Sequence, residues 1–301
     1  MEQELSISDV KNLEEPPDKE FMATLAKGLA VIRAFGADRP RLTLSQAATA
    51  VGLSRATARR VLRTLGQLGY VSQEGREFSL APRVLELGFA YLAGQSWIDR
   101  ALPLMKALNE DIAETCSASV LQGSEIVYVA RVPTRRIMTS AIAVGARLPA
   151  WHTAMGRIQL GFLADEELWS RLRAARIEPF TPSTITDLRA LFERIKQDRE
   201  RGFSIVDEEL ERGLRSISVA LTTRRARPIG AIEVSAHAKR VTRNEMRERF
   251  LSHLREIAPG RGRRRIGRRP GRSPRRLSDF RFHRPDAGQT RGAFFVRRRP
   301  A

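Results

Sequence analysis

Cysteine and histidine are scarce in this sequence and long apolar runs are missing, and each shortage excludes a class of protein or site. The single cysteine in 301 residues, Cys116, cannot form an internal disulfide and is more often a small buried side chain than a nucleophile. The four histidines lie far apart and show no metal-ligand spacing, so we predict no metal and no other cofactor. No apolar run approaches the roughly 18 residues of a membrane span.

The first twenty residues are acidic, with seven carboxylates and two lysines, and no apolar region follows them. Both properties are opposite to those of a signal peptide. The sequence therefore predicts a cytoplasmic protein with no membrane partner. Nucleotide-binding and hydrolase motifs are missing too: there is no P-loop, no G-x-G-x-x-G and no G-x-S-x-G, which weakens an enzyme hypothesis.

Lysine is also rare, and the net charge of +19 comes from arginine that is unevenly distributed. Residues 259–301 carry fifteen arginines and a charge of +13, whereas residues 21–80 carry +6. The last 43 residues have no apolar periodicity, which predicts a disordered Arg-rich tail. Two hypotheses explain this tail: an arm for nucleic acid, or a product of a shifted reading frame near residue 259. We favour the shifted frame, because runs of Arg, Gly, Pro and Ala are typical of out-of-frame translation in a GC-rich genome.

Residues 21–81 follow the order of a winged helix-turn-helix, namely three helices and then a hairpin. Apolar residues at helical spacing predict the first helix over residues 22–35. A capping-box pattern at Thr43 begins the second helix, and Ser54 caps the third. Two short strands around a turn at Gly75 predict the wing.

The turn between the second and third helices has the residue types that two touching helices need. Ala48 is small where the helices meet, and Gly52 can take the positive φ of the turn. Apolar residues follow at Leu53 and at the core positions of the third helix: Ala58, Val61 and Leu62. A charged helix face alone is usually only solvated. The agreement of turn, small residue and hairpin is what predicts DNA binding here.

We expect the third helix to lie in the major groove with its first residues at base edges. Arg55, Thr57 and Arg59 are expected nearest to bases, and Arg60 or Arg63 on phosphate. Arg76, at the tip of the wing, is expected at the DNA backbone or minor groove. The full set of predicted DNA-contacting residues is Thr43, Ser45, Arg55, Ala56, Thr57, Arg59, Arg60, Arg63 and Arg76.

Residues 82–97 predict a linker helix, because a proline stands near its start and apolar residues recur at helical spacing. Hairpins with helices at both ends then indicate an α+β sheet domain over residues 98–258. One strand is expected within residues 136–149, ending near Gly145, and a helix from about Ala150. Exposed amides at the start of that helix would suit a carboxylate. Five arginines could balance the charge of that carboxylate, although each of them taken alone is more often a surface residue: Arg131, Arg135, Arg136, Arg147 and Arg157.

Five stretches carry a resemblance to a known family: LAKGLAVIRAF, LTLSQAATAVGLSRATARRVLRTLGQLGYV, TAMGRIQLGFL, GFSIVDEELERGLRSISVAL and IGAIEVSAHAKRV. Through them residues 21–258 resemble the IclR family of bacterial transcription regulators. The stretch ARVPTRRIMTSAIAVGARLPAWHTAMGR is similar to the branch that controls the β-ketoadipate pathway. Members of that branch respond to protocatechuate, 4-hydroxybenzoate or β-ketoadipate.

The resemblance implies an N-terminal winged helix-turn-helix and a C-terminal GAF-like α/β effector-binding domain joined by a linker helix. It implies homodimers or dimers of dimers on palindromic operators. The family often has a small polar residue where Glu233 stands, and an inward carboxylate would repel an anionic effector unless it were protonated or paired. The residues that the resemblance assigns to effector binding are His152, Thr153, Ala154, Met155, Gly156, Asp207, Ser216, Glu233 and Ser235.

These patterns together predict a ligand-responsive transcription regulator, and the resemblance implies that it controls aromatic acid catabolism. Its partners would be operator DNA and a small carboxylate effector: protocatechuate, 4-hydroxybenzoate or β-ketoadipate. The alternative is an enzyme that acts on a small carboxylate and is fused to a DNA-binding module, with the acids of DEEL at 207–210 as candidates, although a structural role for them is the stronger hypothesis. A third hypothesis is an architectural or RNA-associated protein that acts through its basic tail.

Overall fold

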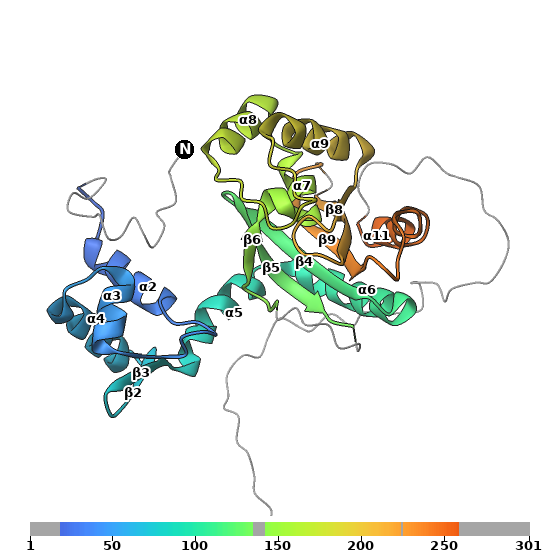
Figure 1. Cartoon of the computed structure of the whole chain (residues 1–301). Helices are drawn as coiled ribbons and strands as arrows, with labels where there is room; N and C mark the ends of the chain where they lie inside the picture. The colour runs from blue at the N-terminus through green and yellow to red at the C-terminus, as the bar shows by residue number, and fades with distance from the viewer. Residues whose placement is uncertain (1–18, 135–141, 224, 259–301) are drawn as a thin grey trace, which may run out of the picture. The chain divides into compact units, whose positions relative to one another are not determined.

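The computed structural model describes residues 19–134, 142–223 and 225–258, which form two groups of elements with separate hydrophobic cores (Figure 1). The first core draws on residues 30–80 and the others on residues 92–258. The acidic N-terminus and the Arg-rich tail, with the predictions made for them, lie outside the described residues. None of the described helices is long and apolar enough to cross a membrane.

The first group is a winged helix-turn-helix, as predicted. Its elements are α2 (Ala23–Arg33), β1 (Arg41–Thr43), α3 (Leu44–Val51), α4 (Arg55–Gln67), β2 (Val71–Glu74) and β3 (Glu77–Leu80). The strands form an antiparallel sheet in the order β1-β3-β2. Strand β1 was not predicted, since three residues are too few for an alternation to show. The helix expected over residues 22–35 ends two residues early.

The turn chemistry explains how α3 and α4 meet. The Thr43 hydroxyl accepts from the Gln46 amide and the Gln46 side chain accepts from the Thr43 amide, which is the predicted capping box. Gly52 ends α3 with φ of 67°, a left-handed conformation that favours glycine. Ser54 then accepts from the Thr57 amide and begins α4. Ala48 is buried at the contact.

The predicted linker helix is divided. A 3₁₀ turn, η1 (Pro82–Val84), leads into α5 (Leu85–Ala93), and the chain leaves helical geometry at Gln95. The next helix, α6 (Ser96–Ile112), already buries its first residues, so the boundary expected at residue 97 falls inside α6. The domain limits given above stay predictions.

The second group is built on one six-stranded antiparallel sheet in the order β6-β5-β4-β9-β8-β7. Its strands are β4 (Thr115–Gln122), β5 (Glu125–Val132), β6 (Arg147–Pro149), β7 (Ser204–Asp207), β8 (Leu214–Thr222) and β9 (Pro228–His237). The helical elements after β6 are η2 (Ala150–His152), α7 (Ala154–Leu160), α8 (Asp165–Ala174), α9 (Leu188–Arg201), α10 (Arg243–Glu245), the π-helical turn η3 (Met246–Phe250) and α11 (Leu251–Ile257).

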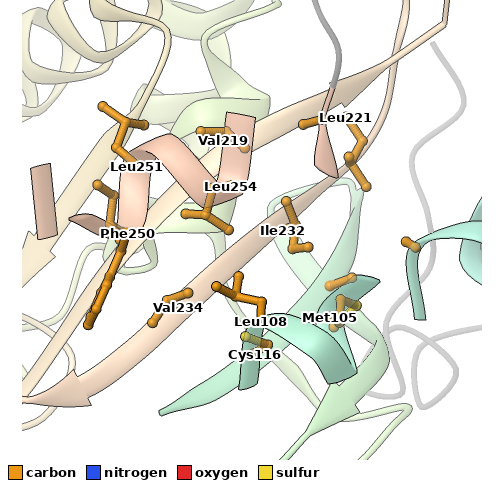
Figure 2. Close-up of a cluster of buried hydrophobic side chains, with 14 of the residues drawn as sticks. Met105, Leu108, Cys116, Val219, Leu221, Ile232, Val234, Phe250, Leu251 and Leu254 are labelled. Carbon is orange, nitrogen blue, oxygen red and sulfur yellow. The ribbon is translucent and has the colours of Figure 1, made fainter. Parts of the chain in front are cut away.

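The two faces of this sheet differ in character because side chains alternate along a strand. One face carries Cys116, Val219, Ile232 and Val234, which pack against α6 and α11 in an apolar core (Figure 2). Burial raises the pKa of the Cys116 thiol to about 12, which confirms the expected inert role. The opposite face is covered by α7, with α8 and α9 packed behind it (Figure 1).

Two predictions in the second group were wrong in detail. The strand expected to end near Gly145 begins after it, at Arg147, and residues 136–141 of the expected strand lie outside the described residues. The helix expected from Ala150 is a 3₁₀ turn, and the α-helix begins at Ala154 with Thr153 as its cap. The first residues of α7 are buried.

Candidate nucleic-acid interface and ligand cavity

Helix α4 has one apolar and one basic face. Ala58, Val61, Leu62 and Leu65 are buried in the core of the first group. The four arginines of the helix point to solvent: Arg55, Arg59, Arg60 and Arg63. Because an α-helix has 3.6 residues per turn, the spacing of the apolar residues along α4 places all four arginines on the side away from the core.

A groove lies between the start of α3, the basic face of α4 and the wing. Six predicted DNA-contacting residues line it: Thr43, Ser45, Arg55, Arg59, Arg63 and Arg76. Residues from the wing that were not predicted, Gln73 and Phe78, line it as well, and Gln73 also donates to the Gly75 carbonyl at the wing tip. The groove thus presents arginines from helix α4 and from the tip of the wing.

The arginines in this groove have no acidic partner within the described residues. Nearby Arg41 differs, because its guanidinium lies 2.6 Å from Glu74 and 3.8 Å from Glu77. A guanidinium that no carboxylate neutralises keeps its donors available for phosphate or guanine. This charge distribution favours an anionic polymer as the occupant of the groove.

Three predicted DNA-contacting residues do not line the groove. Ala56 and Arg60 are exposed on the neighbouring stripe of α4. The Thr57 hydroxyl lies 2.9 Å from the Ser54 hydroxyl, inside the helix cap, which ties it down half-buried. A side chain at that position contacts DNA only if the cap rearranges, so we expect a weaker role for Thr57 than for Arg55 and Arg59.

The second site lies on the polar face of the six-stranded sheet. Strand register places Arg131, Ser117, Glu233 and Ser218 in one row across β5, β4, β9 and β8. A second row joins Thr115, Ser235, Ser216 and Val206 across β4, β9, β8 and β7. Buried sheet faces are normally apolar, since a polar group without a partner is costly there. A buried polar face therefore indicates a binding site.

A cavity opens above this face, under η2 and the start of α7. Six predicted effector residues line it: His152, Thr153, Ala154, Ser216, Glu233 and Ser235. Arg131, one of the arginines considered for balancing the charge of a carboxylate, lines it too. Six other lining residues were not predicted: Thr115, Tyr128, Ile142, Val206, Leu210 and Leu214. The cavity is small, at about 30 Å³. A ring-sized ligand has to widen the cavity.

Glu233 is the buried acid of this cavity. Burial raises its pKa to about 7, against the opposing effects of Arg131 and of the Tyr128 hydroxyl, which lies 3.5 Å from its Oε1. Burial, with Glu233 nearby, raises the pKa of Tyr128 too. Near neutral pH a buried carboxyl with such a pKa exists in both protonation states.

His152 is neutral and incompletely bonded. Burial, followed by the charge of Arg157, lowers its pKa to about 4. Its Nδ1 and the Ser117 hydroxyl are the two buried side-chain atoms without a hydrogen-bond partner within the described residues. The ring of Phe180 meets the imidazole edge-on at 5.0 Å. An unpartnered polar atom at a cavity wall points to a ligand that supplies the missing bond.

Arg157 lies behind His152 and holds the cavity wall that His152 forms. It is a buried residue, although an arginine taken alone was expected to be a surface residue. Its guanidinium is fully buried and makes two bonds with Glu209, of 2.9 and 2.5 Å. Its Nε also donates to the Trp151 carbonyl at 2.6 Å. Because Trp151 precedes His152, the ion pair holds the backbone that positions the imidazole.

Three residues assigned to effector binding do not line the cavity. Asp207 follows Val206 on β7, so its side chain leaves the opposite face, where it pairs with Arg215 and Arg243. Met155 is buried in the core beneath α8 and α9. A Cβ on Gly156 would lie 2.1 Å from the Ala150 carbonyl oxygen, so this glycine allows η2 and α7 to pack closely.

The acids of the DEEL segment have structural partners, which is the role that was favoured for them. Glu208 accepts from the Gly213 amide, and Glu209 is the partner of Arg157. Arg147 pairs with Glu125 away from the cavity, whereas Arg131 lines it. Arg135 and Arg136 lie outside the described residues. No cluster of three His, Cys, Asp or Glu side chains within the described ranges is arranged to hold a metal ion.

Two family models match the chain. The model for the IclR helix-turn-helix domain matches residues 24–75, and the model for the C-terminal domain of IclR-type bacterial transcriptional regulators matches residues 89–260. The matches include the whole cavity and all of the groove except Arg76 and Phe78. Neither model describes an enzyme, so the alternative of an enzyme fused to a DNA-binding module has no support.

Known proteins are similar over most of the chain. The Pca regulon regulatory protein of Pseudomonas putida is 41% identical, over 79% of this chain and 82% of its own length. The p-hydroxybenzoate hydroxylase transcriptional activator of Acinetobacter baylyi is 33% identical, over 81% and 92%. The crystal structure of a transcriptional regulator from Rhodococcus sp. RHA1 is 42% identical with a TM-score of 0.71, over 79% and 96%.

Proposed function

This chain belongs to the IclR family of bacterial transcriptional regulators, and we propose that it controls genes of aromatic acid catabolism in response to a small carboxylate. The observation that carries the proposal is the buried polar cavity that is lined both by Arg131 and by His152, whose Nδ1 has no hydrogen-bond partner within the described residues. The relatives named for the Pca regulon and for p-hydroxybenzoate hydroxylase support an aromatic acid as the ligand class.

The DNA side of the proposal assigns the groove to one half of an operator. The start of α4 enters the major groove, where Arg55 and Arg59 meet base edges or phosphates and Arg63 lies further along the backbone. Arg76 on the wing contacts the backbone or the minor groove. Two copies of the chain would place two such helices on a palindromic site.

The proposed ligand is protocatechuate, 4-hydroxybenzoate or β-ketoadipate. Arg131 would pair with the carboxylate, since a guanidinium is the cation that best matches that geometry. His152, Ser216 and Ser235 would contact the remaining polar groups of the ligand. The cavity has to open around such a molecule, so ligand binding favours an altered geometry of the second group.

We propose that two copies associate through α5. No residue of this helix is buried, and Leu85 and Phe89 expose 74% and 72% of their surface. A contiguous apolar helix face of this kind normally meets a partner. A second copy is the occupant that a palindromic operator requires. Light scattering is expected to give twice the mass of the chain or a higher even multiple, and the mass of one chain would contradict the association.

A thermal-shift screen tests the ligand. The full chain is heated with protocatechuate, 4-hydroxybenzoate, β-ketoadipate, pyruvate and glyoxylate, each far above its expected dissociation constant. A ligand at about 100 times its dissociation constant adds about 2.7 kcal/mol to the free energy of unfolding. We expect a shift confined to one aromatic acid or to β-ketoadipate. A folded protein that responds to none of these acids would contradict the proposed ligand class.

A further inference from the structure

The row of side chains around Glu233 contains an acid, a base and two hydroxyls in a fixed order. Ser117 on β4 stands between Arg131 on β5 and Glu233 on β9, and Ser218 on β8 stands on the far side of Glu233. Ser218 donates to the Ile232 carbonyl, so its hydroxyl proton is committed to the backbone. The Ser117 hydroxyl has no partner within the described residues. The row that contains Glu233 therefore includes a hydroxyl, that of Ser117, whose hydrogen bonds are not all made within the described residues.

Among the residues that the structure describes, few charges face Glu233. Arg131 is the cation that acts on it, and the Tyr128 hydroxyl is its hydrogen-bond donor. His152 adds no charge near neutral pH, and the Cys116 thiol is neutral as well. The Arg157–Glu209 pair behind His152 brings opposite charges. The remaining groups toward Glu233 from the packed strands and from η2 are uncharged: Thr115, Ser117, Ser216, Ser218 and Thr153.

An anionic ligand changes this balance. A carboxylate that pairs with Arg131 enters a small, buried space that already contains the carboxyl of Glu233. Two carboxylates close together in such a space do not both stay ionised, because Arg131 is the one cation among the described lining residues and little water is present. An ordinary carboxylic acid has a pKa of about 4, well below that of Glu233, so the ligand keeps its charge on Arg131. The proton must then go to Glu233.

Resting on the proposed function, we propose that Glu233 takes up one proton from solvent when a carboxylate enters the cavity, so that ligand and proton bind together. A protonated Glu233 becomes a hydrogen-bond donor. It can then donate to a hydroxyl or keto oxygen of the ligand, which the carboxylate form cannot do. Glu233 thereby selects acids that carry a second oxygen over acids that do not.

The pKa of Glu233 in the ligand-free protein makes this coupling effective at physiological pH. The Glu233 pKa of about 7 in the free protein rises further when the anion is bound. A group whose pKa is higher in the complex favours binding fully below its pKa in the free protein. Affinity is then lost as pH rises through about 7, by up to tenfold per pH unit, until the pKa of the complex is reached.

Calorimetric titration of the full chain with 4-hydroxybenzoate and with benzoate tests the inference between about pH 6 and pH 8.5, a range in which both carboxylates stay ionised. Repeating each titration in two buffers of different ionisation heat counts the protons. We expect uptake approaching one proton per ligand at about pH 8 and an affinity that falls with pH. In E233Q the affinity should no longer depend on pH. The preference for 4-hydroxybenzoate over benzoate should persist in E233Q at every pH, because the glutamine amide also donates to the ligand hydroxyl.

The matched control is E211Q, which removes an exposed carboxylate just after β7. It should keep the pH dependence of the wild type, and a flat profile in this control would overturn the assignment to Glu233. If E233Q fails to fold, the proton count of the wild type decides alone. Binding without proton uptake and with constant affinity would overturn the inference and leave the proposed function standing. If neither acid binds at any pH, the proposed function fails first.

Discussion

Replacing Glu209 with glutamine is expected to lower the free energy of unfolding by about 3–5 kcal/mol. Arg157 is fully buried, and Glu209 is the carboxylate that balances its charge. Glutamine keeps the size and one acceptor of the side chain but leaves the buried guanidinium without the carboxylate that is hydrogen-bonded to it. Breaking a buried pair from one side is costly for that reason, even where the pair itself adds little. Urea unfolding followed by circular dichroism measures the loss.

Glu167→Gln is the matched control, because Glu167 pairs with Arg171 at 2.7 Å on a partly exposed face of α8. We expect that change to cost less than about 1 kcal/mol. The double variant Arg157→Met with Glu209→Leu removes both charges and should recover most of the stability lost in Glu209→Gln. A loss below about 1 kcal/mol for Glu209→Gln itself would show that Arg157 reaches water or another acceptor.

The triple variant of Arg55, Arg59 and Arg63 to alanine is expected to weaken DNA binding by about 3 kcal/mol or more, which is at least about 150-fold. All three arginines line the groove without an acidic partner in the described part of the chain. Each phosphate contact adds about one unit to the salt dependence of binding. The slope of log affinity against log salt should therefore become shallower by up to about three units. Fluorescence anisotropy on DNA from upstream of the protein's own gene gives both quantities.

A control variant with the same change of net charge distinguishes the loss of direct DNA contacts from the effect of a lower overall positive charge. Arg173, Arg189 and Arg212 are exposed in the second group of elements, and alanine at all three should change the affinity and the slope little. Melting temperatures of both triple variants should stay close to that of the wild type, since all six side chains are exposed. Equal loss of affinity in the two triple variants would contradict the assignment of the groove.

Most of the winged helix-turn-helix, with the exception of the three-residue strand β1, could be predicted because its signals are local. The positive φ at Gly52 and the cap at Ser54 are each decided within a few residues, and the structure has both. The wing likewise follows from two short strands around Gly75. The expected role of Thr57 at DNA bases was harder to judge from sequence, because its hydroxyl bonds to Ser54 within the helix cap and not toward the groove.

The ligand cavity could be predicted only in part, because it depends on strand register. Alternating serines at 117 and 119 and at 216 and 218 were a visible signal that one sheet face is polar, and this signal was missed. Asp207 was expected at the site, but one residue of shift along β7 sends it to the opposite face. The burial of Arg157 also required knowing that Glu209 reaches it from 52 residues away.

The most direct test of the central claim is the affinity of the full chain for DNA upstream of its own gene, measured with and without the acid that raises its melting temperature. If the cavity and the groove are coupled, saturating acid should change the DNA affinity by about 5-fold to 150-fold, in either direction. Bound DNA should change the affinity for the acid by the same factor. An unchanged DNA affinity at acid concentrations that saturate the cavity would contradict the account of this protein as an acid-responsive regulator.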